Sequence, residues 1–132
     1  MNDIKQVIVV RKDLNMRKGK MIAQGAHASL KVITDRMGVG DWIGSEIIMI
    51  PSDSLPHMVA WIQGLCKKVV VGVDSLNELM DIFYKASNNA IPCSLVQGMG
   101  LTEFSEPTYT AVAVGPDLDD KIDLVTGGLK LL

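Results

Sequence analysis

Strand-like and helix-like stretches alternate along this chain. Short runs of apolar, largely β-branched residues predict four strands, because such runs are typical of strands buried on both faces of a sheet; they cover residues 6–10, 69–73, 93–97 and 108–114. Apolar residues spaced by three and four predict four helices, at residues 18–37, 54–64, 76–87 and 117–125. This alternation predicts a single α/β domain over residues 1–132, with helices on both faces of the sheet in three α/β/α layers.

The connection between the last two predicted strands decides the type of sheet. Residues 98–107 join these strands and show no helical pattern. Because parallel strands usually need a helical crossover, we expect a mixed four-stranded sheet. Residues 41–53 fit neither pattern clearly, and within them residues 46–51 are interpreted as either an edge strand or a packed loop.

The first predicted helix carries two stripes of different chemistry. Apolar residues recur at intervals of four or three and form one stripe, the side that a surface helix normally turns toward the core: Ile22, Ala26, Leu30, Ile33 and Met37. Polar residues recur at the same intervals on another side: Lys20, Gln24, His27 and Lys31. Gly38 and Gly40 follow, and glycine commonly ends a helix.

In the third predicted helix, Ser75 stands three residues before Glu78, which is the spacing of a capping box.

Charge is distributed unevenly along a chain of ordinary globular composition. The 132 residues are 48% hydrophobic and 21% charged, so a disordered or fibrous protein is excluded. The net charge of −2 excludes a uniformly basic nucleic-acid binder. Residues 1–36, however, contain eight Lys and Arg against three Asp, which indicates a local positive patch suited to a few phosphates. A solvated loop and helix end is the alternative interpretation.

Cysteine usage and the N-terminal residues bear on the compartment. Cys66 and Cys93 are too few for a disulfide scaffold and lie among apolar residues, so we interpret both as reduced core residues. Residues 1–5 contain no apolar signal segment, and no apolar run approaches the roughly 20 residues that span a bilayer. We therefore expect a cytoplasmic protein that does not enter the membrane.

Several common functional motifs are incomplete. Gly19-Lys20 lacks the earlier glycine and the following Ser or Thr of a phosphate-binding loop. The glycine pairs at 38/40 and 98/100 lack the third glycine of a dinucleotide site. The two histidines and two cysteines show no metal-ligand spacing, so a metal site has no support.

The segment 16–28 places a lysine-rich loop directly before a helix that carries Lys20, Gln24 and His27 on one side. A helix N-terminus offers unpaired N–H groups and a partial positive charge, so lysines at that point favour an anion. The sequence therefore suggests an anion site here, with a solvated polar face as the alternative.

Several separate segments, in the same order, resemble the archaeal and eukaryotic type of peptidyl-tRNA hydrolase. They are residues 8–14 with the lysine–glycine–lysine helix that follows, 68–71, 94–97, 108–110 with 114–116, and 122–131. The likeness covers both ends of the chain and most of the middle. Residues 37–66 match poorly and are longer than is usual in the family.

The resemblance implies hydrolysis of the ester between a peptide and the 3′ end of tRNA, with no cofactor, by a homodimer that has a four-stranded mixed sheet between helices. The implied catalytic candidates are Lys20, Thr102, His27 and Glu103. The implied substrate-binding candidates are Arg11, Lys12, Lys18, Gln24 and Thr110. In this interpretation Lys20, with Lys18 nearby, offsets charge on the carbonyl oxygen or the terminal phosphate, and Thr102 orients the water.

The chain departs from the family in the loop after residue 97. The family loop reads Asp-Ala-Gly-Arg-Thr-Gln, and its aspartate is held to be catalytic. Here Gly98 stands at the aspartate position, Leu101 at the arginine position and Glu103 at the glutamine position. A general base contributes about 10²–10⁴-fold to a rate, so loss of the aspartate would slow the reaction without necessarily abolishing it. Glu103 and His27 are the candidates to replace the missing acid.

Three functional hypotheses follow from the retained segments and the altered loop. The first is hydrolysis of peptidyl-tRNA, which releases free tRNA for recycling in translation. The second is a catalytically impaired relative that binds tRNA or a protein partner. The third, a different small hydrolase or transferase on the same scaffold, depends on the altered loop alone.

Overall fold

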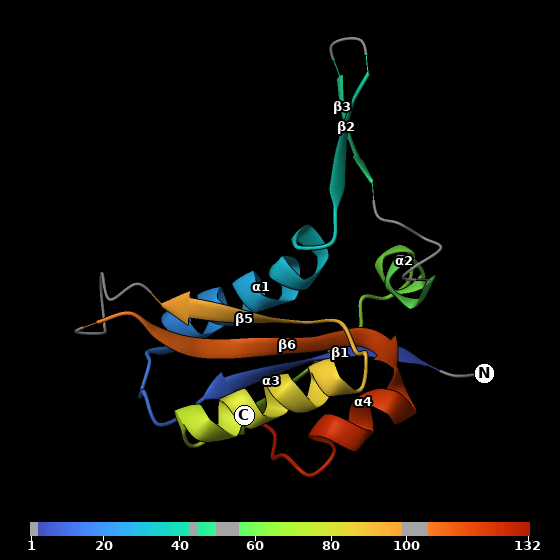
Figure 1. Ribbon diagram of the computed structural model, residues 1–132. Coiled ribbons are helices and arrows are strands. Elements are labelled where there is room, and N and C mark those ends of the chain that lie inside the picture. The colour runs from blue at the N-terminus through green and yellow to red at the C-terminus, as the bar shows by residue number, and fades with distance from the viewer. Residues whose placement is uncertain (1–2, 43–44, 50–55, 99–105) are drawn as a thin grey trace.

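The computed structural model describes residues 3–42, 45–49, 56–98 and 106–132, with the backbone alone over 38–42 and 45–49 (Figure 1). Its elements follow in chain order: β1 (Ile4–Arg11), α1 (Lys18–Thr34), β2 (Gly38–Trp42), β3 (Ser45–Met49), α2 (Pro56–Gln63), β4 (Lys68–Val73), α3 (Leu76–Asn88), β5 (Cys93–Gly98), β6 (Thr108–Leu118) and α4 (Asp119–Thr126). The four predicted strands and four predicted helices are all present.

The central sheet is mixed, which confirms the sequence prediction. Its strand order is β4-β1-β6-β5. Strands β1 and β4 are parallel, whereas β6 is antiparallel to both β1 and β5. A helix-containing connection joins the parallel pair, and the connection from β5 to β6 returns directly, as expected for an antiparallel pair.

Helices cover both faces of the sheet, so the domain has the predicted α/β/α layers (Figure 1). On one face, Ile8, Val10 and Val96 pack with residues of α1 and α2, including Ala28 and Met58. On the other face, alternate residues of the same strands pack against α3 and α4, including Leu79 and Ile122. Strands buried on both sides explain the continuous apolar runs in the sequence.

The prediction for the faces of α1 was wrong. Ile22 and Leu30 of the predicted core stripe are 72% and 58% exposed. The buried residues of α1 are mostly small or polar: Gln24, Gly25, Ala28, Ser29 and Val32. Small side chains bring the helix axis close to the sheet; a Cβ added at Gly25 would meet Ile8 Cγ2 at 3.6 Å. Close approach of the small face leaves the larger apolar residues outside.

A buried hydrogen-bond pair fixes the middle of α1 on β1. Gln6 is fully buried in β1 and accepts a hydrogen bond from Ser29 Oγ at 2.5 Å. Its amide nitrogen donates to the carbonyl oxygens of Ser29 and Gly115 at 3.3 and 3.1 Å. Because a buried amide is costly unless its hydrogen bonds are made, these contacts define where α1 sits.

Residues 38–42 and 45–49 form the two strands of a β-hairpin that the sequence prediction did not resolve. Strands β2 and β3 are antiparallel and form a separate two-stranded sheet, with Gly38 opposite Met49 and Trp42 opposite Ser45. Figure 1 shows the hairpin projecting from the side of the central sheet that carries α1 and α2. Helix α1 therefore ends at Thr34 rather than at the glycines, and Gly38 begins a strand.

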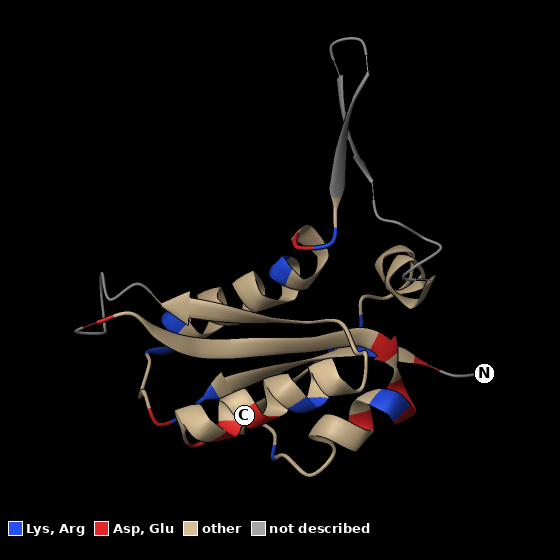
Figure 2. Cartoon of the chain, in the orientation of Figure 1, with Lys and Arg blue, Asp and Glu red and all other residues tan. Residues whose placement is uncertain are grey.

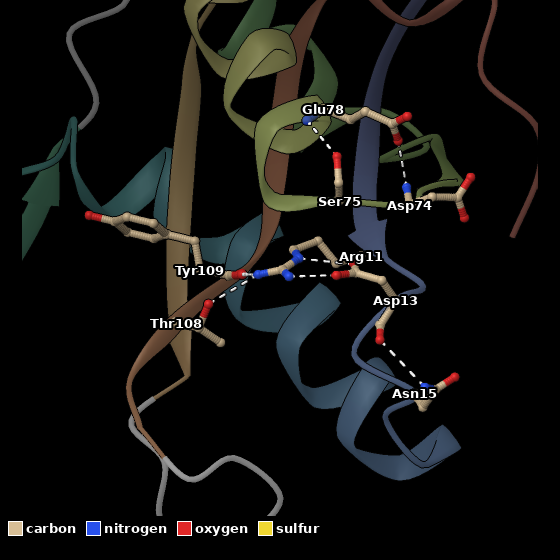
Figure 3. A network of polar contacts seen from close by, with 8 residues as sticks. All are labelled: Arg11, Asp13, Asn15, Asp74, Ser75, Glu78, Thr108 and Tyr109. Atoms are coloured by element: carbon tan, nitrogen blue, oxygen red, sulfur yellow. Dashed lines mark hydrogen bonds and ion pairs between the residues drawn. The ribbon is translucent and has the colours of Figure 1, made fainter.

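The predicted capping box is present at α3. Ser75 Oγ accepts a hydrogen bond from the Glu78 backbone N–H at 3.1 Å. The Glu78 carboxylate accepts in return from the backbone N–H of Asp74 at 2.6 Å, one residue before the N-cap (Figure 3).

Both cysteines are free thiols; Cys93 is buried as expected, whereas Cys66 is only half-buried beside α2.

Candidate functional site

Positive charge gathers on α1, and negative charge gathers on the opposite layer (Figure 2). Helix α1 contains Lys18, Lys20 and Lys31 and no acidic residue. Helices α3 and α4 together contain five acidic residues against Lys85 and Lys121. The asymmetry seen along the sequence is thus also an asymmetry between the two faces of the fold.

The start of α1 is suited to bind an anion. Arg17 occupies the N-cap, where a guanidinium has no acceptor to offer the N–H groups of the first turn. The N–H groups of the first turn and the helix dipole give this end of α1 partial positive charge. Lys18 in this turn is exposed and Lys20 is half-buried, so both are near the surface.

One turn after Lys20, a buried hydrogen bond joins α1 to strand β6. Thr110 Oγ1 donates to Gln24 Oε1 at 2.5 Å, and the same hydroxyl lies 3.4 Å from the carbonyl oxygen of Val96. Thr110 is fully buried and Gln24 is 9% exposed. The amide oxygen of Gln24 is therefore held by β6, which orients its NH₂ group away from β6.

A β-bulge explains why Thr110 faces α1. Val96 pairs with Ala111, whereas the next residue, Gln97, pairs with Tyr109, so Thr110 is an extra residue in β6. An extra residue turns a side chain that strict alternation would place on the other face. Thr110 and Ala111 consequently both lie on the α1 side, as the contacts of Gln24 and Ala28 show. Bulges commonly re-aim side chains next to active sites.

Gly98 lies at the same end of the sheet. It is the buried last residue of β5 and pairs with Thr108 at the start of β6. Because alternate residues of a strand share a face, position 98 lies on the same side of the sheet as Val96, which packs with residues of α1. The position at which the resembling family carries an aspartate thus belongs to the α1 side.

Arg11 joins the end of β1 to the start of β6. Its guanidinium donates to both carboxylate oxygens of Asp13 at 3.0 and 2.6 Å, and to Thr108 Oγ1 and the Tyr109 carbonyl oxygen at 3.0 Å each (Figure 3). Arg11 is only 8% exposed. The hydrogen bonds from Arg11 hold the pKa of Asp13 below its usual value. This guanidinium is committed to internal partners.

The remaining predicted residues are divided between the site and other regions. His27 is exposed on α1 and follows Gln24 by one turn, so Lys20, Gln24 and His27 share a side of the helix. Lys12 lies away from them, in an ion pair with Asp74 at 3.2 Å before α3. Thr102 and Glu103 fall outside the described residues, although the ends of their loop are Gly98 and the strand beginning at Thr108.

Sequence reasoning missed two features of this site. The role of Asp13 as the bidentate partner of Arg11 has a weak signal, since the two residues are two positions apart at the end of a predicted strand. The bulge at Thr110 has no signal in the sequence, because the hydrogen-bond register of β6 depends on its partner strand.

The described residues contain no group of three or more His, Cys, Asp or Glu that is arranged to hold a metal ion. No helix among them is long and apolar enough to span a membrane.

Comparison with known proteins identifies clear relatives. A family model described as peptidyl-tRNA hydrolase PTH2 matches residues 4–132. The chain is 42% identical to a peptidyl-tRNA hydrolase of Methanocaldococcus jannaschii, over 98% of this chain and 100% of that protein. It is 40% identical to the protein of the same name from Nanoarchaeum equitans, over 97% of this chain and 98% of that protein. It is also 40% identical to the one from Methanothermobacter thermautotrophicus, over 98% of this chain and 100% of that protein.

Proposed function

This chain belongs to the peptidyl-tRNA hydrolase PTH2 family, and on that premise we propose that it hydrolyses the ester between peptide and tRNA in peptidyl-tRNA, releasing free tRNA. The observation that supports this proposal is the family match over residues 4–132, together with a relative whose whole length is covered by 98% of this chain. It favours an active hydrolase over the catalytically impaired relative that the altered loop suggested.

The reaction is an acyl transfer to water. The oxygen of a water molecule bonds to the ester carbonyl carbon, and the bond from that carbon to the ribose 3′ oxygen breaks. The proton lost by the water passes through a base to the leaving ribose oxygen, so the products are a peptide carboxylic acid and a tRNA 3′-hydroxyl. The protein has to stabilise the oxyanion, hold the terminal phosphates and position the water.

We assign charge stabilisation to the start of α1. Lys20, with Lys18 in the same turn, offsets negative charge on the carbonyl oxygen or on the terminal phosphate. The N–H groups of the first turn add to the same field. No acidic residue in α1 competes for the anion.

Gln24 and Thr110 form the substrate-binding floor beside Lys20. Because Thr110 holds the amide oxygen of Gln24, the amide NH₂ is left to donate to substrate, such as the ribose or carbonyl oxygen. A glutamine that is nine-tenths buried and held at one end is pre-oriented for such a contact.

His27 and Glu103 are the candidates for the base that takes the proton from water. The exposed position of His27 on the same side of α1 as Lys20 and Gln24 supports the histidine. Thr102 orients the water from the loop that begins after Gly98. Arg11 acts as a positioning residue that fixes the start of β6, and Lys12 contributes a more distant phosphate contact.

The cellular setting and assembly are part of the same proposal. A translation enzyme of this type acts on tRNA in the cytoplasm, and it needs no metal or organic cofactor for ester hydrolysis. We also propose that the protein is a homodimer, which the exposed apolar residues Ile22 and Leu30 on α1 support.

The direct test is release of an N-blocked amino acid from its tRNA by the purified protein. We expect release that is proportional to enzyme concentration and unaffected by a metal chelator. An unblocked aminoacyl-tRNA serves as the comparison substrate. Failure to release the blocked amino acid with enzyme in large excess over substrate contradicts the proposed activity.

A further inference from the structure

Strand β5 forms one edge of the central sheet. The strand order is β4-β1-β6-β5, so β6 lies on one side of β5 and, within the described chain, no strand lies on the other. At the opposite edge, residues 130–132 cover β4: Gly72 N–H donates to the Lys130 carbonyl oxygen at 3.0 Å, and Leu132 N–H donates to that of Val70 at 3.1 Å. The two edges are therefore unlike, and the edge at β5 is the more open one.

The hydrogen-bond pattern shows which backbone groups of β5 face outward. Gly115 N–H donates to the Pro92 carbonyl oxygen at 2.7 Å, so residue 92 faces β6. Inward-facing and outward-facing residues alternate in an antiparallel pair, so positions 93, 95 and 97 face the outer edge. The Cys93 carbonyl oxygen agrees with this, because it accepts a hydrogen bond from Arg36 Nη2 at 3.4 Å rather than from β6.

The open part of this edge is short. Arg36 occupies the outer edge at Cys93, so the open stretch runs from Leu95 to Gly98 and is about 13 Å long at about 3.3 Å per residue. Leu95 and Gln97 each turn one N–H and one C=O outward, and no backbone hydrogen bond from another described segment reaches them. Unpaired groups on an edge strand are a template for pairing with another extended chain.

This stretch leads into the candidate hydrolytic site. Thr110 joins Gln24 to the carbonyl oxygen of Val96, so Gln24 lies over the β5–β6 pair. Helix α1 then runs back along β5, since Asp35 at its C-cap accepts from Ser94 Oγ at 2.7 Å. Figure 1 shows the start of α1 beside the arrowhead of β5. An ester held at this start of α1 therefore has the outer edge of β5 beside its acyl part.

The apolar groove on the other side of α1 is less suited to the acyl part. This open groove of about 680 Å³ lies between α1, α2 and the strands β1 and β4. Gln24 turns toward β6 through Thr110, so the body of α1 separates the groove from the site. Apolar walls also select particular side chains, whereas the peptide differs from one tRNA substrate to the next. Hydrogen bonds to an added strand use main-chain groups, which nearly every residue provides.

We propose that the peptide of peptidyl-tRNA pairs with the outer edge of β5 as an added, parallel strand. Its ester carbonyl lies at its C-terminal end, beside Gly98, so its N-terminus points toward Cys93, and β5 runs in the same direction. Leu95 and Gln97 exchange backbone hydrogen bonds with every second peptide residue. About four residues fit before Arg36 ends the open stretch. This inference rests on the proposed function and names how its site recognises the acyl part of the substrate.

An edge of this length suits a tethered peptide better than a second copy of the chain. Two outward-facing residues offer two N–H and two C=O groups, whereas a stable protein interface buries about 800 Å² from each partner. A peptide that is covalently joined to a bound tRNA is held at high effective concentration. A few hydrogen bonds are therefore enough to align it.

The first test varies the length of the peptide and uses the wild-type protein. We measure kcat/KM for tRNAs that carry N-blocked peptides of one to eight glycines, which have no side chains to bind. We expect kcat/KM to rise at least about tenfold between one and four residues and to change less than about twofold beyond, because Arg36 ends the open edge. Equal values at every length, or a rise that continues to eight residues, overturn the proposal.

The second test removes one peptide N–H at a time. In the tetraglycyl substrate, each glycine in turn is replaced by N-methylglycine, which cannot donate a hydrogen bond. We expect kcat/KM to fall about three- to tenfold at alternate positions and to stay within about twofold at the positions between them, because only every second residue faces β5. The same loss at all positions, or at none, contradicts an added strand.

The third test removes one N–H from the protein. Gln97 is exposed, and proline is tolerated on an edge strand where the N–H faces outward. Gln97→Pro is expected to lower the ratio of kcat/KM for four residues to that for one residue at least about threefold. Gln97→Ala keeps the N–H and should keep the wild-type ratio. An unchanged ratio in a Gln97→Pro variant with wild-type circular dichroism and melting overturns the proposal; if that variant is unfolded, the two substrate series decide.

These outcomes separate the inference from the proposed function. Hydrolysis of all the substrates with one common kcat/KM supports the proposed function and overturns the added strand. Release of peptide from none of them, with enzyme in large excess, contradicts the proposed function and removes this inference with it.

Discussion

Single hydrogen-bonding side chains decide where the candidate site lies. Thr110 hydrogen-bonds to Gln24 from β6, and the Arg11 side chain connects the end of β1 to the start of β6. The sequence identified both residues through family resemblance, but it did not indicate their partners. Partners 86 and 97 positions apart come together only through the sheet register, which no local pattern records.

Thr110→Val removes the hydroxyl that holds Gln24 while keeping the shape of the side chain. We expect the free energy of unfolding to fall by about 1–3 kcal/mol, because the buried amide oxygen of Gln24 loses its donor. Hydrolysis should fall at least about tenfold, since the amide is no longer oriented. Thr126→Val is the control: Thr126 is also buried, but its hydroxyl donates to the carbonyl oxygen of Ile122 in α4, so its variant should keep wild-type hydrolysis. Wild-type kinetics in Thr110→Val would contradict the assignment of this pair.

Asp13→Asn tests the ion pair that holds Arg11. At neutral pH we expect a loss of about 1–3 kcal/mol in unfolding free energy, because a buried guanidinium loses its charged acceptor. The folded protein lowers the pKa of Asp13, so this contribution is fully present above the unfolded value of about 3.9 and is lost as the pH falls through the lower folded value. Denaturation of the variant and the wild type between neutral and acid pH should therefore show a difference that shrinks below about pH 4.

At the scale of elements, periodicity predicted the secondary structure well and the orientation of α1 poorly. The predicted strand 69–73 is β4 (Lys68–Val73), and the capping box marks the start of α3. The stripe containing Ile22 and Leu30 faces solvent because Gly25, Ala28 and Ser29 fit closer to the sheet. A hydrophobicity pattern does not weigh such close packing. The hairpin was unresolved because its strands are short and contain two glycines.

The end of β5 gives a test at this scale. In Gly98→Asp, strand alternation directs the new carboxylate to the side of α1 that carries Lys20 and Gln24. We expect single-turnover hydrolysis to rise about tenfold or more, since a positioned base contributes about 10²–10⁴-fold. Gln97→Asp is the matched control, because the neighbouring residue is exposed and faces the other side of the sheet. An equal effect of both substitutions would contradict the placement of the site on the α1 side.

For the whole molecule, the uneven charge along the sequence becomes a basic start of α1 opposite acidic α3 and α4 (Figure 2). The layers, the mixed sheet and the family were all predicted from the sequence. The open groove and the projecting hairpin were not, because residues 41–53 fit neither a helical nor a strand pattern clearly. What covers an apolar face depends on a partner that a single sequence does not describe.

The charge arrangement predicts how tRNA binding depends on salt. If Lys12, Arg17, Lys18 and Lys20 contact about four phosphates of single-stranded tRNA, the logarithm of the association constant should fall against the logarithm of salt concentration with a slope of roughly −3. Fluorescence titration with tRNA over a range of salt concentrations measures it. Lys18→Ala should make the slope shallower by about 0.7, whereas Lys85→Ala on α3 should leave it unchanged. A slope near zero for the wild type would contradict RNA binding at the start of α1.

The most direct test of the account is the single-turnover rate of peptidyl-tRNA hydrolysis by Lys20→Ala beside Lys31→Ala. Both substitutions remove a lysine from α1, but Lys31 lies at the far end, paired with Asp35. The account predicts that Lys20→Ala lowers the rate at least tenfold, whereas Lys31→Ala stays near the wild type. Equal rates for the two variants would contradict an ester site at the start of this helix.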